Sequence, residues 1–261
     1  MTKHRSFNIL GNIAVVNFSD KTKLKDKKKF AKEILKKNQK IKTILEKSGK
    51  FSGRLRKMKT KYLAGEKNKE VLYKENNCIF RFNINTTYFS PRLSNERKEI
   101  ASLIRRNDAV LVMFAGVGPY SICIAKNSKA KVYSNEINRE ANKYAELNIK
   151  LNKVKDKIKL IPGDIKKIAK ELEKKKQKFN VIVMPRPRLK ESFLKQAFLL
   201  SKKGTKIFYY DFCKIEDKDK IIEKIRNEAK KAKKKIKITR IKNAGEIAPY
   251  KIRIRVDFIV A

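Results

Sequence analysis

Short apolar runs alternate with amphipathic segments from residue 94 to the end of the chain, and this alternation constrains the fold more than any other feature. Strands and helices that alternate at this spacing are typical of a parallel sheet with helices on both faces. The two strand candidates nearest the end suit an antiparallel strand added to that sheet. The sequence therefore predicts an α/β fold. Its expected helices are 94–106, 119–127, 139–151, 164–174, 190–201 and 217–234, and its expected strands are 109–114, 131–134, 157–161, 181–184, 206–210, 236–242 and 251–260.

The first part of the chain has a different pattern. Residues 7–18 are expected to form a strand, a bend and a second strand, and residues 24–47 a Lys-rich amphipathic helix or helix pair. Two β-like stretches follow at 71–73 and 78–82. We therefore expect a small α+β domain over residues 1–85 and the α/β domain over residues 86–261.

The charge of the chain is strongly unbalanced. Its 69 Lys and Arg residues against 26 Asp and Glu give a formal net charge of +43, which indicates a polyanionic partner such as nucleic acid. Much of the excess is Lys in generic runs, so genome bias or heat adaptation is an alternative origin. No apolar run approaches the ~20 residues of a membrane span, and the N-terminus has no signal-peptide core. A cytoplasmic protein without a membrane partner is expected.

Cysteine and histidine are scarce. The three cysteines, Cys78, Cys123 and Cys213, are far apart, and His4 is the single histidine. This disfavours a metal site, a disulfide framework and Ser-His or Cys-His catalysis. Acid–base chemistry in this chain would have to use carboxylates, Lys, Tyr or the main chain.

A glycine turn marks a candidate cofactor site. The run 113–119 follows a buried strand and opens a helix, and Gly116 and Gly118 would let the backbone approach a ligand at the helix N-terminus. Glu136 and Asp164 follow the next two strands, where carboxylates can accept hydrogen bonds from ribose hydroxyls and an adenine amino group. Either acid alone could equally be a helix cap. Together with the turn they indicate an adenosine-containing ligand, although the glycines do not complete a dinucleotide fingerprint.

Two motifs carry a resemblance to a known family. The segments TYFSPRLSNER (87–97) and MFAGVGPYSI (113–122) closely resemble the archaeal and eukaryotic tRNA guanine-N1 methyltransferase family, and the similarity extends from residues 7–16 to Pro249-Tyr250. That family uses S-adenosylmethionine to methylate guanosine 37, immediately 3′ of the anticodon. The resemblance implies a Rossmann-like class I methyltransferase domain preceded by a target-recognition domain. It also implies S-adenosylmethionine as cofactor and the tRNA anticodon loop as partner.

The resemblance assigns two catalytic residues. Glu96 falls on the family motif Y-F-S-P-R-x-x-x-E-R, and Arg56 falls on the arginine of its G-x-x-R motif. Guanine N1 carries a proton, so methyl transfer needs a base, which suits Glu96, and a cation beside O6, which suits Arg56. Composition alone leaves other interpretations open, because Glu96 beside Arg97 could complement a helix dipole and Arg56 could contact phosphate.

The other site residues also follow from the family pattern. Those expected to bind the cofactor are Tyr88, Phe114, Gly116, Gly118, Glu136 and Asp164. Those expected to bind the substrate are Pro185, Arg186, Pro187 and Arg188, which stand where the family usually has N-L-P-K.

The chain departs from the family pattern in three places. Pro185 replaces the family's Asn, which puts the usual amide contact to the target base in doubt, and Val112 replaces an Asp that precedes M-F-A-G. Many members also carry an additional N-terminal domain that checks the tRNA elbow. We expect a short form without it, which recognises tRNA tertiary structure more weakly or through basic surface.

Two further functions remain open at this point, with a monomer expected in each case. The enzyme could also methylate C7 of the tricyclic wyosine precursor 4-demethylwyosine at the same tRNA position, because some archaeal relatives that depart from N-L-P-K do so. Alternatively, the chain could be a non-catalytic tRNA-binding module that relies on charge.

Overall fold

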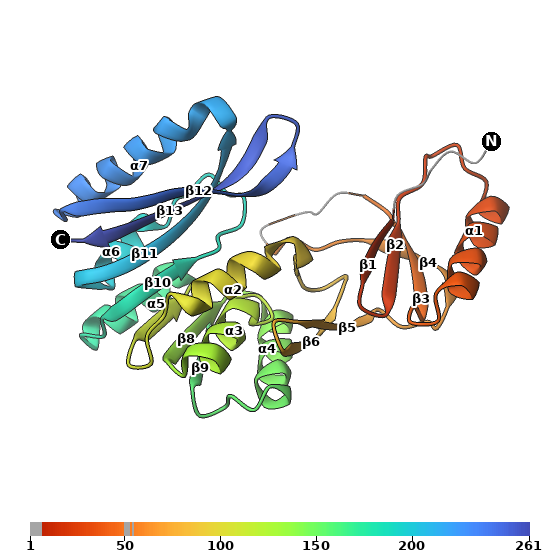
Figure 1. Ribbon diagram of the computed structural model, residues 1–261, viewed down its shortest axis with the longest axis horizontal. Helices are drawn as coiled ribbons and strands as arrows, with labels where there is room; N and C mark the ends of the chain where they lie inside the picture. Colours follow the sequence, from red (N-terminus) through yellow and green to blue (C-terminus); the bar gives the residue numbers. More distant parts are fainter. Residues whose placement is uncertain (1–6, 50–52, 54) are drawn as a thin grey trace.

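The computed structural model describes residues 7–49, 53 and 55–261, in which a small N-terminal sheet with one helix stands beside a larger α/β part (Figure 1). The small sheet has the order β1-β2-β3-β4. Its elements are β1 (Phe7–Leu10), β2 (Ile13–Val16), α1 (Leu24–Lys37), β3 (Thr43–Lys47) and β4 (Thr60–Gly65). The two strands expected within residues 7–18 are confirmed.

The expected helix over 24–47 is wrong in its second half. The helix ends at Lys37, and residues 43–47 form β3, which runs parallel to β2. Ile44 is buried against α1, whereas its neighbour Leu45 is buried in the core shared with the next hairpin. Neighbouring side chains that point to opposite faces require a strand. The spacing of Ile41, Ile44 and Leu45 also fits a helix, so periodicity alone could not decide.

A two-stranded hairpin links the two parts of the molecule. Its strands β5 (Glu70–Glu75) and β6 (Cys78–Asn83) cover the β-like stretches expected from the sequence. Two asparagines one turn apart, one on α4 (Arg139–Leu151) and one at its C-terminal cap, hold the edge of β6. Asn148 accepts from the N–H of Arg81 at 2.7 Å and donates to its carbonyl at 3.0 Å, and Asn152 does the same to Ile79 at 2.9 and 2.7 Å.

The large sheet has seven strands in the order β12-β13-β11-β10-β7-β8-β9. The five strands from β11 to β9 are parallel, and β13 and β12 are antiparallel additions at one edge. The predicted mostly parallel α/β domain with an antiparallel strand is confirmed. Its elements are η1 (Pro91–Leu93), α2 (Ser94–Ser102), β7 (Ala109–Val112), α3 (Pro119–Ser128), β8 (Lys131–Glu136), α4, β9 (Ile158–Pro162), α5 (Ile165–Lys174), β10 (Phe179–Met184), α6 (Leu194–Leu199), β11 (Ser201–Lys214), η2 (Ile215–Asp217), α7 (Lys218–Lys231), β12 (Ile236–Ala248) and β13 (Lys251–Val260).

Each face of this sheet has its own apolar core. Helices α2, α3 and α4 pack on one face, against side chains such as Val110 and Val183. Helices α5, α6 and α7 pack on the other face, against the alternate side chains such as Leu111 and Ile182. Because helices cover both faces of the sheet, the functional loops lie at the ends of the strands. None of the helices in the described ranges is both long enough and apolar enough to cross a bilayer.

The expected helix over 190–201 is much shorter in the structure. Helix α6 spans only Leu194–Leu199, because Phe193 adopts a left-handed conformation (φ 60°) before it and Ser201 already pairs with β10 after it. The segment before Phe193 is instead a loop held by Arg186. Helix α2 likewise ends at Ser102, whereas the sequence pattern predicted a helix to residue 106.

Candidate active site

A cavity lies at the carboxyl ends of the parallel strands, where open α/β sheets bind their ligands. Its wall combines the glycine turn, the segment before α2, the loop after β10 and residues from β11 and β13. Its lining residues include Arg56, Tyr88, Arg97, Phe114, Gly116, Tyr120, Glu136, Gly163, Ile165, Pro185, Arg186, Pro187, Tyr210 and Arg253.

The glycine turn forms the floor of the cavity. Phe114, Gly116 and Gly118 all have positive φ (58°, 58° and 88°), so the chain turns sharply between β7 and α3. A side chain at Gly116 would begin 3.5 Å from the carbonyl oxygen of Tyr88, at the cavity wall. Gly118 is different, because a Cβ there would meet Ile122 at 3.2 Å, and Gly118 is absent from the described lining residues. Gly118 therefore allows the turn to pack on α3.

Glu136 connects two strand ends beneath the cavity. One oxygen of its carboxylate accepts from the N–H of Gly116 at 2.8 Å, and the other accepts from the N–H of Asn138 at 2.8 Å. Glu136 lines the cavity, which suits a ribose-binding carboxylate. Asp164 has another task, since it caps α5 by accepting from the N–H of Lys166 at 2.9 Å. Among the described residues near it, Gly163 and Ile165 line the cavity and Asp164 does not.

Arg56 and Tyr88 meet across the two parts of the molecule. The guanidinium of Arg56 lies 4.6 Å from the centre of the Tyr88 ring, a cation–π contact, and both residues line the cavity with Phe114. Arg56 belongs to the segment between β3 and β4 and has a positive φ of 50°. The structure thus brings the expected catalytic arginine and two of the expected cofactor residues together.

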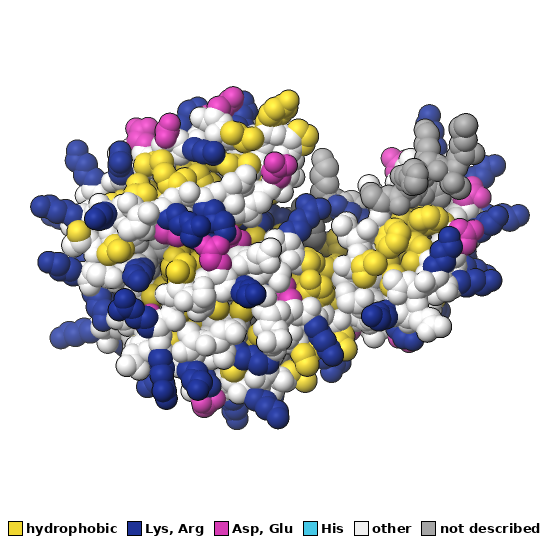
Figure 2. Space-filling view, viewed as in Figure 1, with side chains coloured by type: hydrophobic (Ala, Val, Ile, Leu, Met, Phe, Trp, Pro, Cys, Tyr) yellow, Lys and Arg dark blue, Asp and Glu magenta, His cyan; other side chains and the backbone are white. Residues whose placement is uncertain are grey.

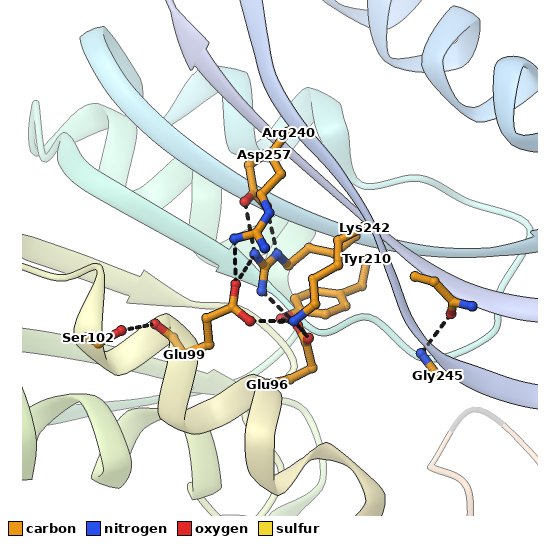
Figure 3. A network of polar contacts seen from close by, with 10 residues as sticks. Glu96, Glu99, Ser102, Tyr210, Arg240, Lys242, Gly245 and Asp257 are labelled. Carbon is orange, nitrogen blue, oxygen red and sulfur yellow. Dashed lines mark hydrogen bonds and ion pairs between the residues drawn. The ribbon is translucent and has the colours of Figure 1, made fainter.

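Glu96 lies behind the cavity wall, in the first turn of α2. Its side chain is buried, and it is absent from the described lining residues. The carboxylate accepts from the hydroxyl of Tyr210 at 3.0 Å, from Arg255 at 2.8 Å and from Lys242 at 2.5 Å (Figure 3). Tyr210 does line the cavity, so Glu96 reaches the cavity wall through that phenol.

The same network includes Glu99 on the next turn of α2. Glu99 accepts from Arg255 at 2.6 Å and from Arg240 at 2.8 Å, and it also pairs with Lys242. Burial alone would raise the pKa of Glu99, but the hydrogen bonds from Lys242 and Arg255 outweigh it and lower the pKa to about 2. The network therefore fastens α2 to strands β12 and β13.

Arg97 binds partners outside the network of Glu96. Its guanidinium donates to Glu75 at 2.6 Å and to the carbonyl of Ser90 at 3.0 Å, and it lies 5.0 Å from the ring centre of Phe89. Glu96 and Arg97 are thus not partners in a pair that complements the helix dipole. Each has its own buried counter-charge.

The segment 185–188 forms part of the cavity wall. Pro185, Arg186 and Pro187 line it, whereas Arg188 is exposed and does not. Arg186 is only 3% exposed, because it donates to Asp211 at 2.8 Å and to the carbonyls of Leu189 and Glu191 at 2.7 Å. Its guanidinium holds the loop in place.

Tyr210 and Arg253 are among the lining residues that the sequence did not predict as part of the site. Tyr210 stands near the end of the expected strand 206–210, at the edge where ligands bind, so its position could have drawn attention to it. Arg253 comes from β13 and packs over Phe212, 5.3 Å from its ring centre. No comparable sequence signal marked Arg253, because its place at the cavity depends on the antiparallel pairing of β13 with β11.

The described residues contain no group of three or more His, Cys, Asp or Glu side chains that could hold a metal ion. The single histidine, His4, lies outside the described residues.

The fold is that of Rossmann-like class I methyltransferases. The crystal structure of Trm5b from Pyrococcus abyssi superposes with a TM-score of 0.85 at 32% identity, covering 98% of this chain and 75% of that one. The structure titled as the complex of aTrm5 and tRNALeu also has a TM-score of 0.85, at 30% identity, covering 98% and 72%.

The chain belongs to the TRM5/TYW2 methyltransferase family. The model of the TRM5/TYW2 methyltransferase domain matches residues 71–239, and that of the TYW2 N-terminal domain matches residues 2–68. A relative in Nanoarchaeum equitans, the tRNA (guanine(37)-N(1))/4-demethylwyosine(37)-methyltransferase Taw22, is 32% identical over 97% of this chain and 98% of its own. The family resemblance seen in the motifs is confirmed.

Proposed function

We propose that this protein is a tRNA methyltransferase that transfers a methyl group from S-adenosylmethionine to N1 of guanosine 37. The observation that carries the proposal is the single cavity that joins Arg56 and Tyr88 to the glycine turn and Glu136. Relatives at 32–33% identity that cover nearly the whole chain carry this activity in their names. The basic side chains spread over the visible face suit a tRNA partner (Figure 2).

The residues of the cavity fit S-adenosylmethionine. The carboxylate of Glu136 would accept from the ribose hydroxyls, Gly163 and Ile165 would border the adenine, and Gly116 would let the ligand lie against the backbone. Phe114 and Tyr88 supply aromatic surface beside the turn. The bound cofactor would supply an electrophilic methyl group on its sulfonium.

The protein's own side chains would then prepare the target base. The base must leave its stack to enter a cavity of this kind. Arg56 is a permanent cation at the cavity wall, suited to stabilise the negative charge that develops on guanine O6 as N1 loses its proton. Glu96 is the proton acceptor on the same side of the molecule. Val112 lies fully buried within β7 and has no ionisable group, so it cannot supply the acid that the family usually has at this position.

Incubation with a labelled methyl donor tests this function directly. Unmodified tRNA transcript with G37 should be methylated and should yield N1-methylguanosine on nucleoside analysis, whereas a matched transcript with A37 should not. Isothermal titration should detect binding of S-adenosylmethionine to the protein alone. An absence of cofactor binding together with tight tRNA binding would instead favour a non-catalytic tRNA-binding module.

A second activity has its own supporting observation. Pro185 presents an apolar ring to the cavity where the family usually has an amide, and a wall without that amide can accept the larger tricyclic ring of 4-demethylwyosine. The Nanoarchaeum equitans relative carries both activities in its name. Mass spectrometry of nucleosides from tRNA that contains this precursor should then show a second methylated product, at C7, besides N1-methylguanosine from the unmodified transcript.

A further inference from the structure

Glu96 and the cavity are separated by one side chain. Glu96 is 5% exposed and lies outside the described lining residues, whereas Tyr210 lines the cavity and donates its hydroxyl to Glu96 at 3.0 Å. A base that must remove a proton from a bound guanine needs hydrogen-bond reach to it. In this structure only the phenol of Tyr210 spans that gap among the described partners of Glu96.

The partners of Glu96 hold it in this position. Arg255 from β13 donates to the same oxygen as Tyr210 at 2.8 Å, and Lys242 from β12 donates to the other oxygen at 2.5 Å (Figure 3). Turning the carboxylate into the cavity would break both ion pairs and leave Arg255, which is fully buried, with one partner fewer. Breaking a buried ion pair is costly, so the carboxylate is held behind the phenol.

We propose that Tyr210 contacts the target guanine and relays its N1 proton to Glu96. The inference rests on the proposed function. As the methyl group bonds to N1, the N1–H proton passes to the hydroxyl oxygen of Tyr210, and the proton of that hydroxyl passes to the carboxylate of Glu96. The electron pair of the N–H bond stays on the ring, the sulfonium becomes a neutral thioether, and the phenol ends neutral.

The surroundings of Tyr210 favour a relay over a free phenolate. Burial raises the pKa of Tyr210 well above its usual value, and the neighbouring Tyr120 and Glu96 raise it further, against the opposing effect of Arg255. The phenol therefore keeps its proton at neutral pH. Its oxygen donates one hydrogen to Glu96 and retains lone-pair capacity to accept another. A phenol that stays protonated can give its proton to Glu96 only if it accepts the guanine proton at the same time.

Charged groups from each neighbouring element complete the site. Besides Lys242 and Arg255, Glu99 lies on the same helix as Glu96, and Arg240 and Asp257 bind Glu99 and Arg255. Lys242 and Arg255 bind the two oxygens of Glu96 and so fix the orientation of the carboxylate toward Tyr210.

A double-mutant cycle tests the relay by single-turnover methylation of the G37 transcript. Tyr210→Phe and Glu96→Gln should each lower the rate by about 10²-fold, and the double variant should be no more than about threefold slower than either, because both act in one step. Binding of S-adenosylmethionine and tRNA should be unchanged. Tyr144→Phe is the matched control, since its hydroxyl also bonds a carboxylate, that of Glu70 at 3.1 Å, outside the described cavity lining.

Several outcomes would overturn the relay. If Tyr210→Phe stays within about threefold of the wild type while Glu96→Gln is slow, Glu96 reaches the base directly. Multiplicative losses in the double variant would mean two independent steps. If the wild-type protein leaves G37 unmethylated, the proposed function itself is wrong. A failure of the relay alone would leave wild-type methylation intact, so the two results can be told apart.

A proton inventory of the wild-type reaction needs no variant, so it decides even if Tyr210→Phe fails to fold. In mixtures of H₂O and D₂O the rate should fall along a curve, as two protons in flight require. A straight line would show a single transferred proton and would contradict the relay.

Discussion

At the scale of single residues, Glu136 decides how the cofactor end of the cavity is built. Its two oxygens bind the N–H groups of Gly116 and Asn138, so the carboxylate fixes the glycine turn while it faces the cavity. Truncating the side chain of Glu136 should therefore disturb both the glycine turn and cofactor binding.

We expect Glu136→Ala to weaken binding of S-adenosylmethionine by about 10- to 100-fold, because it removes charge-assisted hydrogen bonds of about 1.5–3 kcal/mol. Isothermal titration measures the change. Glu140→Ala is the control, since Glu140 is half-exposed and pairs with Lys143 at 2.8 Å, and the affinity of this variant should match the wild type. Equal affinity in both variants would remove Glu136 from the cofactor site.

Glu99 should contribute to the pH dependence of stability. Its pKa is lowered to about 2, below its unfolded value, so the folded state gains stability wherever the carboxylate is ionised in both states. That gain is complete above about pH 5 and is lost as the pH falls toward about 2. Because the side chain is partly exposed, the gain is at most about 3 kcal/mol.

Urea denaturation at several pH values checks this sign. Glu99→Gln should be less stable than the wild type at about pH 6, and the difference should shrink as the pH falls to about 2.5. Glu146→Gln, which removes an exposed i,i+4 pair with Lys150, should change stability by less than about 0.5 kcal/mol. A constant difference between Glu99→Gln and the wild type would exclude the ion-pair origin.

How much of the site the sequence could predict depends on the range of the interaction involved. The glycine turn and Glu136 are local features of successive strand ends, so their spacing in the sequence was sufficient to predict that they lie together. The resemblance added Arg56 and Tyr88, which meet in the structure. The environment of Arg186 could not be predicted from residue spacing, because its partner Asp211 lies 25 residues away, on strand β11. The phenol of Tyr210 beside Glu96 depends on a contact across 114 residues.

At the scale of elements, the alternation of strands and helices was predictable because each segment of the large sheet buries one periodic apolar face. Short segments were harder. Residues 43–47 fit both periodicities, and only the neighbours β2 and β4 decide for a strand. The length of α6 was set by the loop that Arg186 anchors, a tertiary contact that no local pattern encodes.

The hairpin β5-β6 offers a prediction at this scale. Asn148 and Asn152 are buried and satisfy both main-chain groups of Arg81 and Ile79. Alanine at either position leaves a buried N–H and carbonyl without these partners, which should cost about 1–3 kcal/mol each in the free energy of unfolding.

Urea denaturation measures that cost. The matched control is Lys150→Ala on the same helix, whose side chain is exposed and pairs only with Glu146 at 3.0 Å among the described acids. It should change stability by less than about 0.5 kcal/mol. If Asn148→Ala behaved like this control, the two asparagines would not be what holds β6 to α4.

At the scale of the whole molecule, the two parts share a core and a site. Ile13, Val15 and Leu45 of the small sheet belong to the same apolar cluster as Phe80 and Val110. The contact of Arg56 with Tyr88 also joins the two parts. The domain boundary at residues 85 and 86 stays a prediction. We propose that the two parts together form the surface that receives the anticodon loop.

The net charge of +43 leads to the prediction for the whole molecule. Lys and Arg side chains cover both parts of the visible face (Figure 2), so a bound tRNA would meet many cations at once and release its condensed counterions. With about 6–10 phosphate contacts, affinity should fall by about 10³-fold or more between 50 and 200 mM salt. Filter binding of one transcript over this range measures the slope.

Binding of S-adenosylmethionine is the internal control for that titration, because its expected contacts are the turn backbone, aromatic rings and one carboxylate. Its affinity should vary by less than about threefold over the same range, since few charges are exchanged. A tRNA affinity that is equally insensitive to salt would show that the excess lysines lie away from the RNA. The composition of the chain would then reflect adaptation of the surface, and recognition would depend on the cavity and its rim.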